Sequence, residues 1–101
     1  MHAESILIDA LAYLNEGKNW IKDAYETKNG VCLSKALMHV SEVGKPGETI
    51  PEYFQARSFV REAIEEYTDN RLGLVQFNDF SFTKFEDVKA VLLKAIELSR
   101  K

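Results

Sequence analysis

Four segments of the chain repeat apolar residues at intervals of three and four positions, the spacing that predicts amphipathic helices. They cover residues 3–16, a stretch that begins near 31 or 32 and ends before 44, residues 51–67, and the stretch from 83 to the last residues. The positions expected to face the core are, helix by helix, Ile6, Leu7, Ala10, Leu11, Tyr13 and Leu14; Leu33, Ala36, Leu37, Val40 and Val43; Ala56, Phe59, Val60, Ala63, Ile64 and Tyr67; Phe85, Val88, Val91, Leu92, Ala95 and Ile96. The pattern predicts a mostly all-α fold, a compact single domain of about four helices over residues 1–101.

Local motifs mark where three of these helices begin or end. Gly17 follows the first helix, and glycine is a frequent helix terminator. The sequences TIPE at 49–52 and TKFE at 83–86 have the form of capping boxes, in which a threonine and a glutamate satisfy free backbone N–H groups. We therefore expect the third and fourth helices to start at these motifs.

Two connecting segments lack helical periodicity. Residues 18–29, before the second helix, fit either a helical turn or a short hairpin, and Asn29-Gly30 ends this segment with a turn signal. Residues 72–82, before the fourth helix, are aromatic and apolar with polar interruptions, and they fit either a packed loop or one short strand. We expect irregular structure at both places.

Composition and charge narrow the class of protein. In 101 residues, 46% are hydrophobic and 29% are charged, which excludes a disordered chain. No apolar run approaches the roughly 20 residues that cross a bilayer. The 13 basic and 16 acidic residues give a net charge of −3, which disfavours general nucleic-acid binding. The single cysteine excludes an internal disulfide and fits a cytoplasmic location.

Cys32 is the one candidate nucleophile that the sequence offers, because a thiol at the start of a helix is readily activated. The only possible histidine bases are His2 and His39. His39 follows Cys32 by seven residues, about 10.5 Å along a helix, whereas a nucleophile and its base need about 3 Å. A buried, unreactive thiol is the commoner situation. No spacing of ligands predicts a metal site, and no glycine-rich phosphate loop is present, so we predict no catalytic residue, metal or cofactor.

Asn78 and Asp79 are two polar residues inside an aromatic segment, where an unpaired polar group is costly. They can shape a turn through hydrogen bonds to nearby backbone, or they can line a pocket together with Trp20 and Tyr25. The sequence leaves both interpretations open.

Two further residue sets have a functional and a structural interpretation. Arg57 and Arg61 can grip the phosphate of a small ligand, or they can belong to a solvated face of mixed charge. Phe77, Phe80 and Phe82 can pack in the core, or they can form a partner-binding patch and a dimer interface.

The order of several short motifs resembles that of a family of small bacterial and phage proteins classified only as a domain of unknown function. The motifs are Trp20 with Ala24, the sequence GVCL at 30–33 leading into Ala36, FND at 77–79, and Thr83 followed by EDV at 86–88. The chain departs from the family pattern at Asp23 and Lys35, where small residues are expected, and at Phe77, where the family has tryptophan. The resemblance implies a compact, mostly helical domain and brings no catalytic residue with it.

These observations favour non-catalytic binding. We expect an accessory protein that sequesters a small ligand or blocks a protein partner. The alternatives are a cysteine-dependent hydrolase or transferase that uses Cys32, and a self-associating structural subunit. A pocket, if present, is expected to use the side chains singled out above, namely Trp20, Tyr25, Cys32, Asn78 and Asp79, with Arg57 or Arg61 as the anion contact.

Overall fold

A computed structural model describes residues 2–41 and 50–101. The described chain forms the helices α1 (Ala3–Leu14), α2 (Leu33–Ser41), α3 (Ile50–Thr68), α4 (Leu74–Asp79) and α5 (Phe85–Ser99). A 3-10 turn, η1 (Asn15–Gly17), follows α1, and the strands β1 (Glu26–Thr27) and β2 (Gly30–Val31) precede α2. The predicted mostly helical fold is thereby confirmed.

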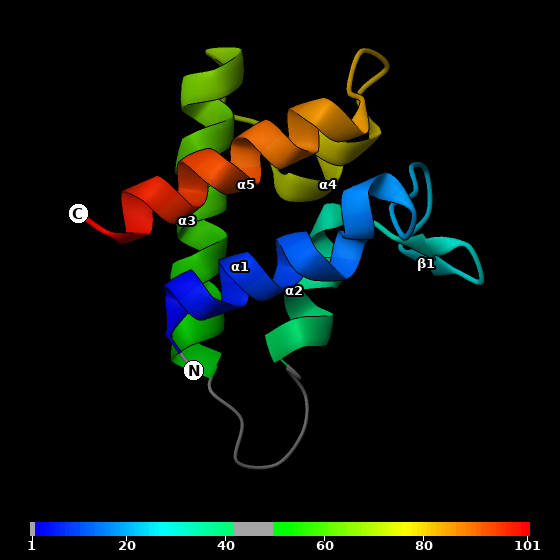
Figure 1. Ribbon diagram of the computed structural model, residues 1–101. Coiled ribbons are helices and arrows are strands. Elements are labelled where there is room, and N and C mark those ends of the chain that lie inside the picture. Colours follow the sequence, from blue (N-terminus) through cyan, green and yellow to red (C-terminus); the bar gives the residue numbers. More distant parts are fainter. Residues whose placement is uncertain (1, 42–49) are drawn as a thin grey trace.

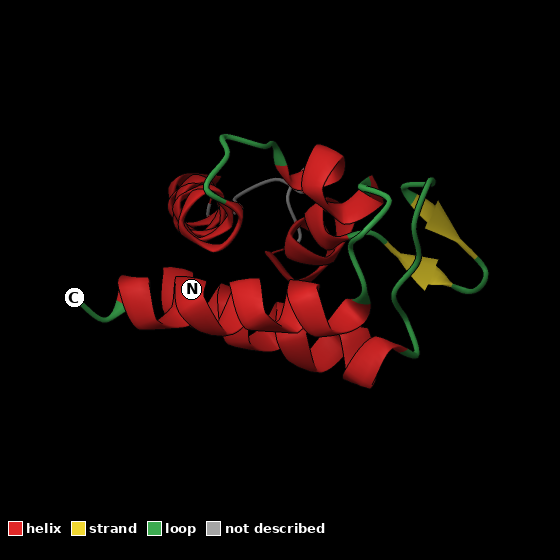
Figure 2. Ribbon diagram, turned by 90° about the horizontal axis from the view of Figure 1, so that it is seen from above, coloured by secondary structure: helices red, strands yellow, loops and turns green. Residues whose placement is uncertain are grey.

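The helices pack in two layers that cross at a steep angle. Helices α1 and α5 run antiparallel, and both pack on α3, which crosses them (Figure 1). Seen along α3, this pair forms one layer, while α3 and α2 lie in the other (Figure 2). Helix α4 packs against α2 and α3. Ion pairs join α1 or the η1 turn to α5 at both ends, from Glu4 to Arg100 at 3.3 Å and from Glu16 to Lys89 at 3.1 Å.

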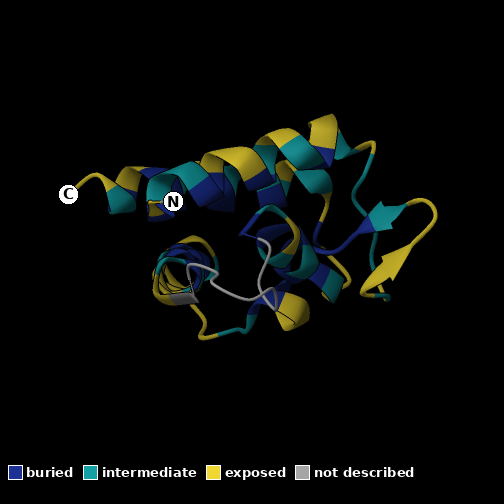
Figure 3. Cartoon of the chain, turned by 90° about the horizontal axis from the view of Figure 1, so that it is seen from below, coloured by how far each residue is buried: buried dark blue, intermediate teal, exposed yellow. Residues whose placement is uncertain are grey.

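The core lies between the two layers. The buried sides of α1 and α5 are turned toward α3 and α2, and the exposed sides face away (Figure 3). Most predicted core positions are buried, and Ile6, Leu37 and Leu92 are fully inaccessible. Tyr67 is a correction, because its side chain is 45% exposed near the end of α3. The predicted core position at 43 lies outside the described residues.

Residues 18–29 contain the first strand and the turn of a hairpin, which was one of the two alternatives for this segment, and the second strand follows at Gly30–Val31. Strand β1 pairs antiparallel with β2, with Thr27 opposite Gly30. The paired strands are two residues long, too short for an alternating hydrophobic pattern to be recognised in the sequence. The hairpin leads the chain directly into α2.

Residues 72–82 are neither a loop throughout nor a strand, because they contain helix α4. Gly73 precedes the helix, and the Gln76 side chain accepts a hydrogen bond from its N–H at 3.4 Å. Leu74, Phe77 and Asn78 are the buried residues of α4, at three- and four-residue spacing. The helical signal is present but covers less than two turns, which is why a short segment of this kind is missed.

The capping box expected at 83–86 is displaced by one residue. Helix α5 has Lys84 at its N-cap, and the Asp87 carboxylate accepts the Lys84 N–H at 2.7 Å. Thr83 is buried, and its hydroxyl has no hydrogen-bond partner among the described residues. The acidic residue that closes the box is therefore Asp87 and not Glu86. The box expected at 49–52 begins outside the described residues.

Candidate functional site

The side chain of Asn78 joins three parts of the chain that are distant in sequence. Its carbonyl oxygen accepts hydrogen bonds from the Trp20 indole at 2.6 Å and from the Leu33 N–H at 3.0 Å. Its amide nitrogen donates to the Ile21 carbonyl at 3.0 Å and to Asp79 at 2.9 Å. Leu33 begins α2, so Asn78 caps a helix whose sequence lies 45 residues away. Asn78 is fully buried, and these contacts are those of a structural residue.

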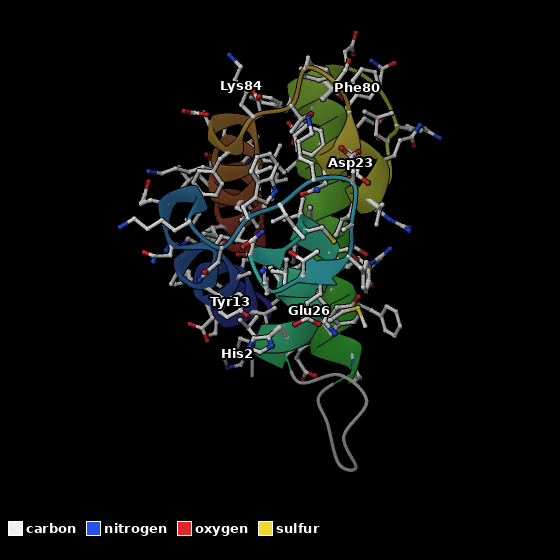
Figure 4. The ribbon with its side chains drawn as sticks, turned by 90° about the vertical axis from the view of Figure 1, so that its right-hand side faces the viewer. His2, Tyr13, Asp23, Glu26, Phe80 and Lys84 are labelled. Atoms are coloured by element: carbon white, nitrogen blue, oxygen red, sulfur yellow. The ribbon has the colours of Figure 1, made fainter. Side chains whose placement is uncertain are left out.

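Hydrogen bonds of Asp79 and Lys22 hold the end of α4 and the segment that follows it in place. Asp79 accepts the Asp23 N–H at 2.8 Å. The Lys22 ammonium donates to the carbonyl of Phe80 at 2.6 Å and to the carbonyl of Thr83 at 2.8 Å. Figure 4 places Phe80 at one end of the molecule with Lys84 and Asp23. The exposed turn at 80–83 is therefore held by charge-assisted hydrogen bonds to its backbone.

These contacts do not form the pocket that the sequence suggested for Trp20, Tyr25 and Asn78. Trp20 packs its ring 6.0 Å from that of Phe85, and its indole N–H is used by Asn78. Tyr25 is 46% exposed and donates its hydroxyl hydrogen to the Met38 sulfur at 2.8 Å. Four cavities among the described residues are lined by side chains other than those of Trp20, Tyr25, Cys32, Asn78 and Asp79.

Cys32 is 1% exposed, and its sulfur accepts the Lys35 N–H at 3.4 Å. It occupies the position before α2, as predicted. His39 stacks on the Tyr13 ring with centroids 4.3 Å apart, and it lines a shallow surface depression with Tyr13. The Cys32 thiol is thus buried at the start of a helix, and the exposed His39 imidazole stacks on the Tyr13 ring.

The two candidate anion-binding arginines have different surroundings. Arg57 donates to the hydroxyls of Ser34 and Tyr53, each at 3.2 Å. Arg61 is exposed and lines a cavity of about 490 Å³ with Glu65 and Arg71. The mixed charges around Arg61 match the structural interpretation, in which these residues belong to a solvated face of mixed charge. An anion site at these residues stays a prediction.

The phenylalanine cluster divides into one core residue and two surface residues. Phe77 is fully buried, so it is removed from the proposed partner interface. It points to the core because it shares the buried face of α4 with Leu74. Phe80 and Phe82 are 42% and 48% exposed, and their rings are in T-shaped contact with centroids 4.8 Å apart.

Phe80 and Phe82 line a cavity of about 470 Å³ that we call the aromatic cavity. It lies between the end of α3 and the turn after α4, and its lining residues are Tyr67, Thr68, Asn70, Leu72, Phe80 and Phe82. Its volume is within the range of small-ligand pockets, roughly 300–1,000 Å³. Among the four cavities it is the one in which three aromatic side chains meet.

The polar side chains that line the aromatic cavity donate hydrogen bonds to other groups of the protein. The Thr68 hydroxyl donates to the Ile64 carbonyl at 2.8 Å, and the Asn70 amide donates to the Thr68 carbonyl at 3.1 Å. The Tyr67 hydroxyl donates to Asp87 at 2.5 Å. This hydrogen bond, together with burial and the negative charge of Asp87, raises the pKa of Tyr67. The hydroxyls of Tyr67 and Thr68 are therefore already engaged within the protein, and the cavity combines aromatic rings with the polar side chains of Thr68 and Asn70.

The sequence pointed to Phe80 and Phe82 but missed Tyr67, Leu72 and Lys22. Tyr67 has core spacing on α3, but it lies one residue before the end of the helix and is 45% exposed. Lys22 is one of many surface lysines in the sequence, and only the folded chain shows that it holds the turn at 80–83. A single sequence carries no signal for such a contact.

The described residues contain no group of three or more side chains placed to hold a metal ion. None of the helices in this part of the chain combines the length and apolar character that crossing a membrane requires.

Comparison with known proteins gives one finding. A family model, that of a family of unknown function, matches residues 1–98. No curated protein and no solved structure matches the chain.

Proposed function

The chain belongs to the family of unknown function DUF6197, and from this premise we propose that the protein is a non-enzymatic binding protein that holds a small ligand in the aromatic cavity. The observation that carries the proposal is a pair of exposed phenylalanines, Phe80 and Phe82, on a turn fixed by the Lys22 ammonium. Exposed aromatic rings on a preorganised segment bind without a large ordering cost. The proposal places the protein in the cytoplasm of a bacterium or in a phage-infected cell, as an accessory protein.

The size and chemistry of the aromatic cavity support a small ligand. The hydroxyl of Tyr67 and the side chains of Thr68 and Asn70 already donate within the protein. A ligand that buried itself there would gain mainly from contact with the rings, and it would break no internal hydrogen bond.

The test uses Nile red, a neutral dye whose fluorescence rises in apolar surroundings. We expect wild-type protein to bind it and the double variant Phe80→Ser with Phe82→Ser to lose most of the signal. The matched control is Phe54→Ser, because Phe54 is 55% exposed on α3 and lies outside the aromatic cavity. Equal fluorescence with wild type and the double variant, both folded by circular dichroism, would show that the cavity is not the binding site.

A second candidate is a protein partner that docks on the same two phenylalanines, which includes self-association of this chain. Exposed aromatic side chains are typical anchors of protein interfaces. Light scattering separates the self-association case, because a homodimer that uses Phe80 and Phe82 becomes a monomer in the double variant.

The cysteine-dependent enzyme is less well supported. A nucleophile must be reachable by its substrate, and Cys32 is 1% exposed. We expect iodoacetamide to modify Cys32 far more slowly in the folded protein than in denaturant. Fast modification of the folded protein would restore the enzyme hypothesis.

A further inference from the structure

We propose that the aromatic cavity is a binding site for a small organic cation of the quaternary ammonium class. This inference deepens the function proposed above and rests on it, since the site is the same. It adds the charge of the ligand, which the size of the cavity and its aromatic rings alone do not specify.

Three aromatic side chains border the aromatic cavity and keep large parts of their surfaces free. Tyr67, Phe80 and Phe82 are 45%, 42% and 48% exposed. The planes of the Phe80 and Phe82 rings lie at 70° to each other, so the two rings form differently oriented walls. The Tyr67 ring is fixed from behind by T-shaped contact with Phe77, with centroids 6.3 Å apart. The face of an aromatic ring carries negative potential, which attracts a cation within about 6 Å of the centroid.

Among the described residues, no basic side chain lines the aromatic cavity, and a carboxylate lies behind one of its walls. Its lining contains no lysine, arginine or histidine. The Asp87 carboxylate accepts the Tyr67 hydroxyl hydrogen at 2.5 Å, which places negative charge behind one wall. Two basic side chains lie on neighbouring segments: Arg71 pairs with Glu65 at 3.3 Å, and the Lys22 ammonium donates to the carbonyls of Phe80 and Thr83 on the turn that borders the cavity. An anionic ligand would find no cationic side chain among the described ones that border the cavity.

A quaternary ammonium fits this lining better than a primary amine does. A primary ammonium has three N–H groups and is strongly hydrated, so it needs acceptors when it leaves water. A trimethylammonium group has no N–H, and its methyl groups contact aromatic faces directly. The exposed rings of Tyr67, Phe80 and Phe82 border the aromatic cavity.

The experiment compares choline with its neutral carbon isostere, in which a tert-butyl group replaces the trimethylammonium group. Both ligands are titrated into isotopically labelled full-length protein, and backbone amide shifts are followed by NMR. We expect choline to shift the amides of residues 67–72 and 80–83 and to bind about tenfold more tightly than the isostere, because shape and size are matched and only the charge differs.

Variants assign the effect to the rings. Phe82→Leu keeps an apolar side chain but removes a ring, so we expect choline affinity to fall several-fold while affinity for the neutral isostere changes little. Phe54→Leu, which alters an exposed ring outside the cavity, is expected to leave both affinities unchanged.

The outcomes separate this inference from the proposed function. Equal affinity for choline and the isostere, with Nile red still bound at the cavity, overturns the cation site and leaves the binding function standing. Choline shifts that persist unchanged in Phe82→Leu, or that lie away from residues 67–72 and 80–83, also overturn it. Failure of choline, the isostere and Nile red alike overturns both proposals.

Discussion

Gly30 occupies a place in the hairpin that only glycine fits. Its φ is +151°, a value that side chains rarely allow, and a Cβ atom built there would lie 2.1 Å from the Asn19 carbonyl oxygen. The same oxygen accepts the Val31 N–H at 2.7 Å, so the two backbone segments are locked together. The hairpin and the start of α2 therefore depend on the absence of one methyl group.

Replacing Gly30 with alanine is expected to lower the free energy of unfolding by more than about 1–3 kcal/mol, the usual cost of backbone strain alone, since the clash adds to it. Urea unfolding followed by circular dichroism measures the change. Gly73→Ala is the control, because nothing lies within 4 Å of a Cβ at that position, and we expect a loss of no more than about 1 kcal/mol there. Equal losses at the two sites would contradict the hairpin geometry.

Tyr67 is the residue whose ionisation the fold changes. Its hydrogen bond to Asp87, then burial, then the charge of Asp87 raise its pKa above the ordinary value of about 10. Because the protonated form makes the bond, its contribution to stability is complete below pH about 10 and is lost as pH rises through the raised pKa.

A difference titration of wild type against Tyr67→Phe, read by tyrosinate absorbance, isolates this group among the four tyrosines. We expect Tyr67 to ionise above the ordinary range in wild type and to return toward it in Asp87→Asn, which removes the negative charge. Identical titration of Tyr67 in both backgrounds would show that Asp87 does not set its pKa.

At the scale of the element, the helix starts are completed by groups that local motifs do not reveal. Helix α2 receives its cap from Asn78 on α4, and the thiol of Cys32 accepts the Lys35 N–H. Helix α5 is capped through Asp87, while Thr83 keeps its hydroxyl buried and unpaired among the described residues. If the Thr83 hydroxyl capped α5, its removal would lower the stability of the protein. If the hydroxyl is buried without a partner, its removal would not lower the stability.

Thr83→Val is expected to leave stability unchanged or to raise it by about 1 kcal/mol, because the variant keeps the shape and removes an unsatisfied hydroxyl. A capping threonine would instead cost about 1 kcal/mol when lost. Thr68→Val is the matched control, since the Thr68 hydroxyl donates to Ile64 and accepts the Asn70 N–H. Thermal unfolding of both variants tests the assignment, and a clear loss for Thr83→Val would restore the original capping box.

At the scale of the whole molecule, the buried apolar residues lie where the α1–α5 layer packs against the layer of α2 and α3, with α4 beside it. The ion pairs from Glu4 to Arg100 and from Glu16 to Lys89 join the same elements but lie on the surface, where such pairs contribute little. We therefore expect the loss of stability on substitution to depend on how deeply the replaced side chain is buried. Phe77 and Phe80, which are three residues apart, allow this comparison.

Phe77→Ala is expected to cost about 3–5 kcal/mol, because it removes a fully buried ring and leaves a cavity. Phe80→Ala makes the same chemical change at a 42% exposed position, and we expect a loss of less than about 1 kcal/mol. Urea midpoints of the two variants give the comparison directly. Similar midpoints would mean that α4 is not packed as described.

The helical fold was predictable because its signal is repeated many times along the chain. Apolar residues recur at three- and four-residue spacing over α1, α3 and α5, and positions such as Ile6, Val60 and Leu92 are buried as expected. Short elements gave a weaker signal: α4 has six residues and the hairpin strands have two each. The sequence also marked Asn78 and Asp79 as residues that need hydrogen-bond partners.

Only the tertiary structure determined which groups are the hydrogen-bond partners of Asn78 and Asp79, and which aromatic residues reach the surface. Asn78 meets Trp20 and Leu33 because the hairpin and α2 return to α4, and no local rule contains that return. The sequence by itself determined which faces of the helices are apolar, since periodicity is a local property. The aromatic cavity forms where the end of α3 meets the turn that Lys22 holds, and this meeting depends on packing between distant segments.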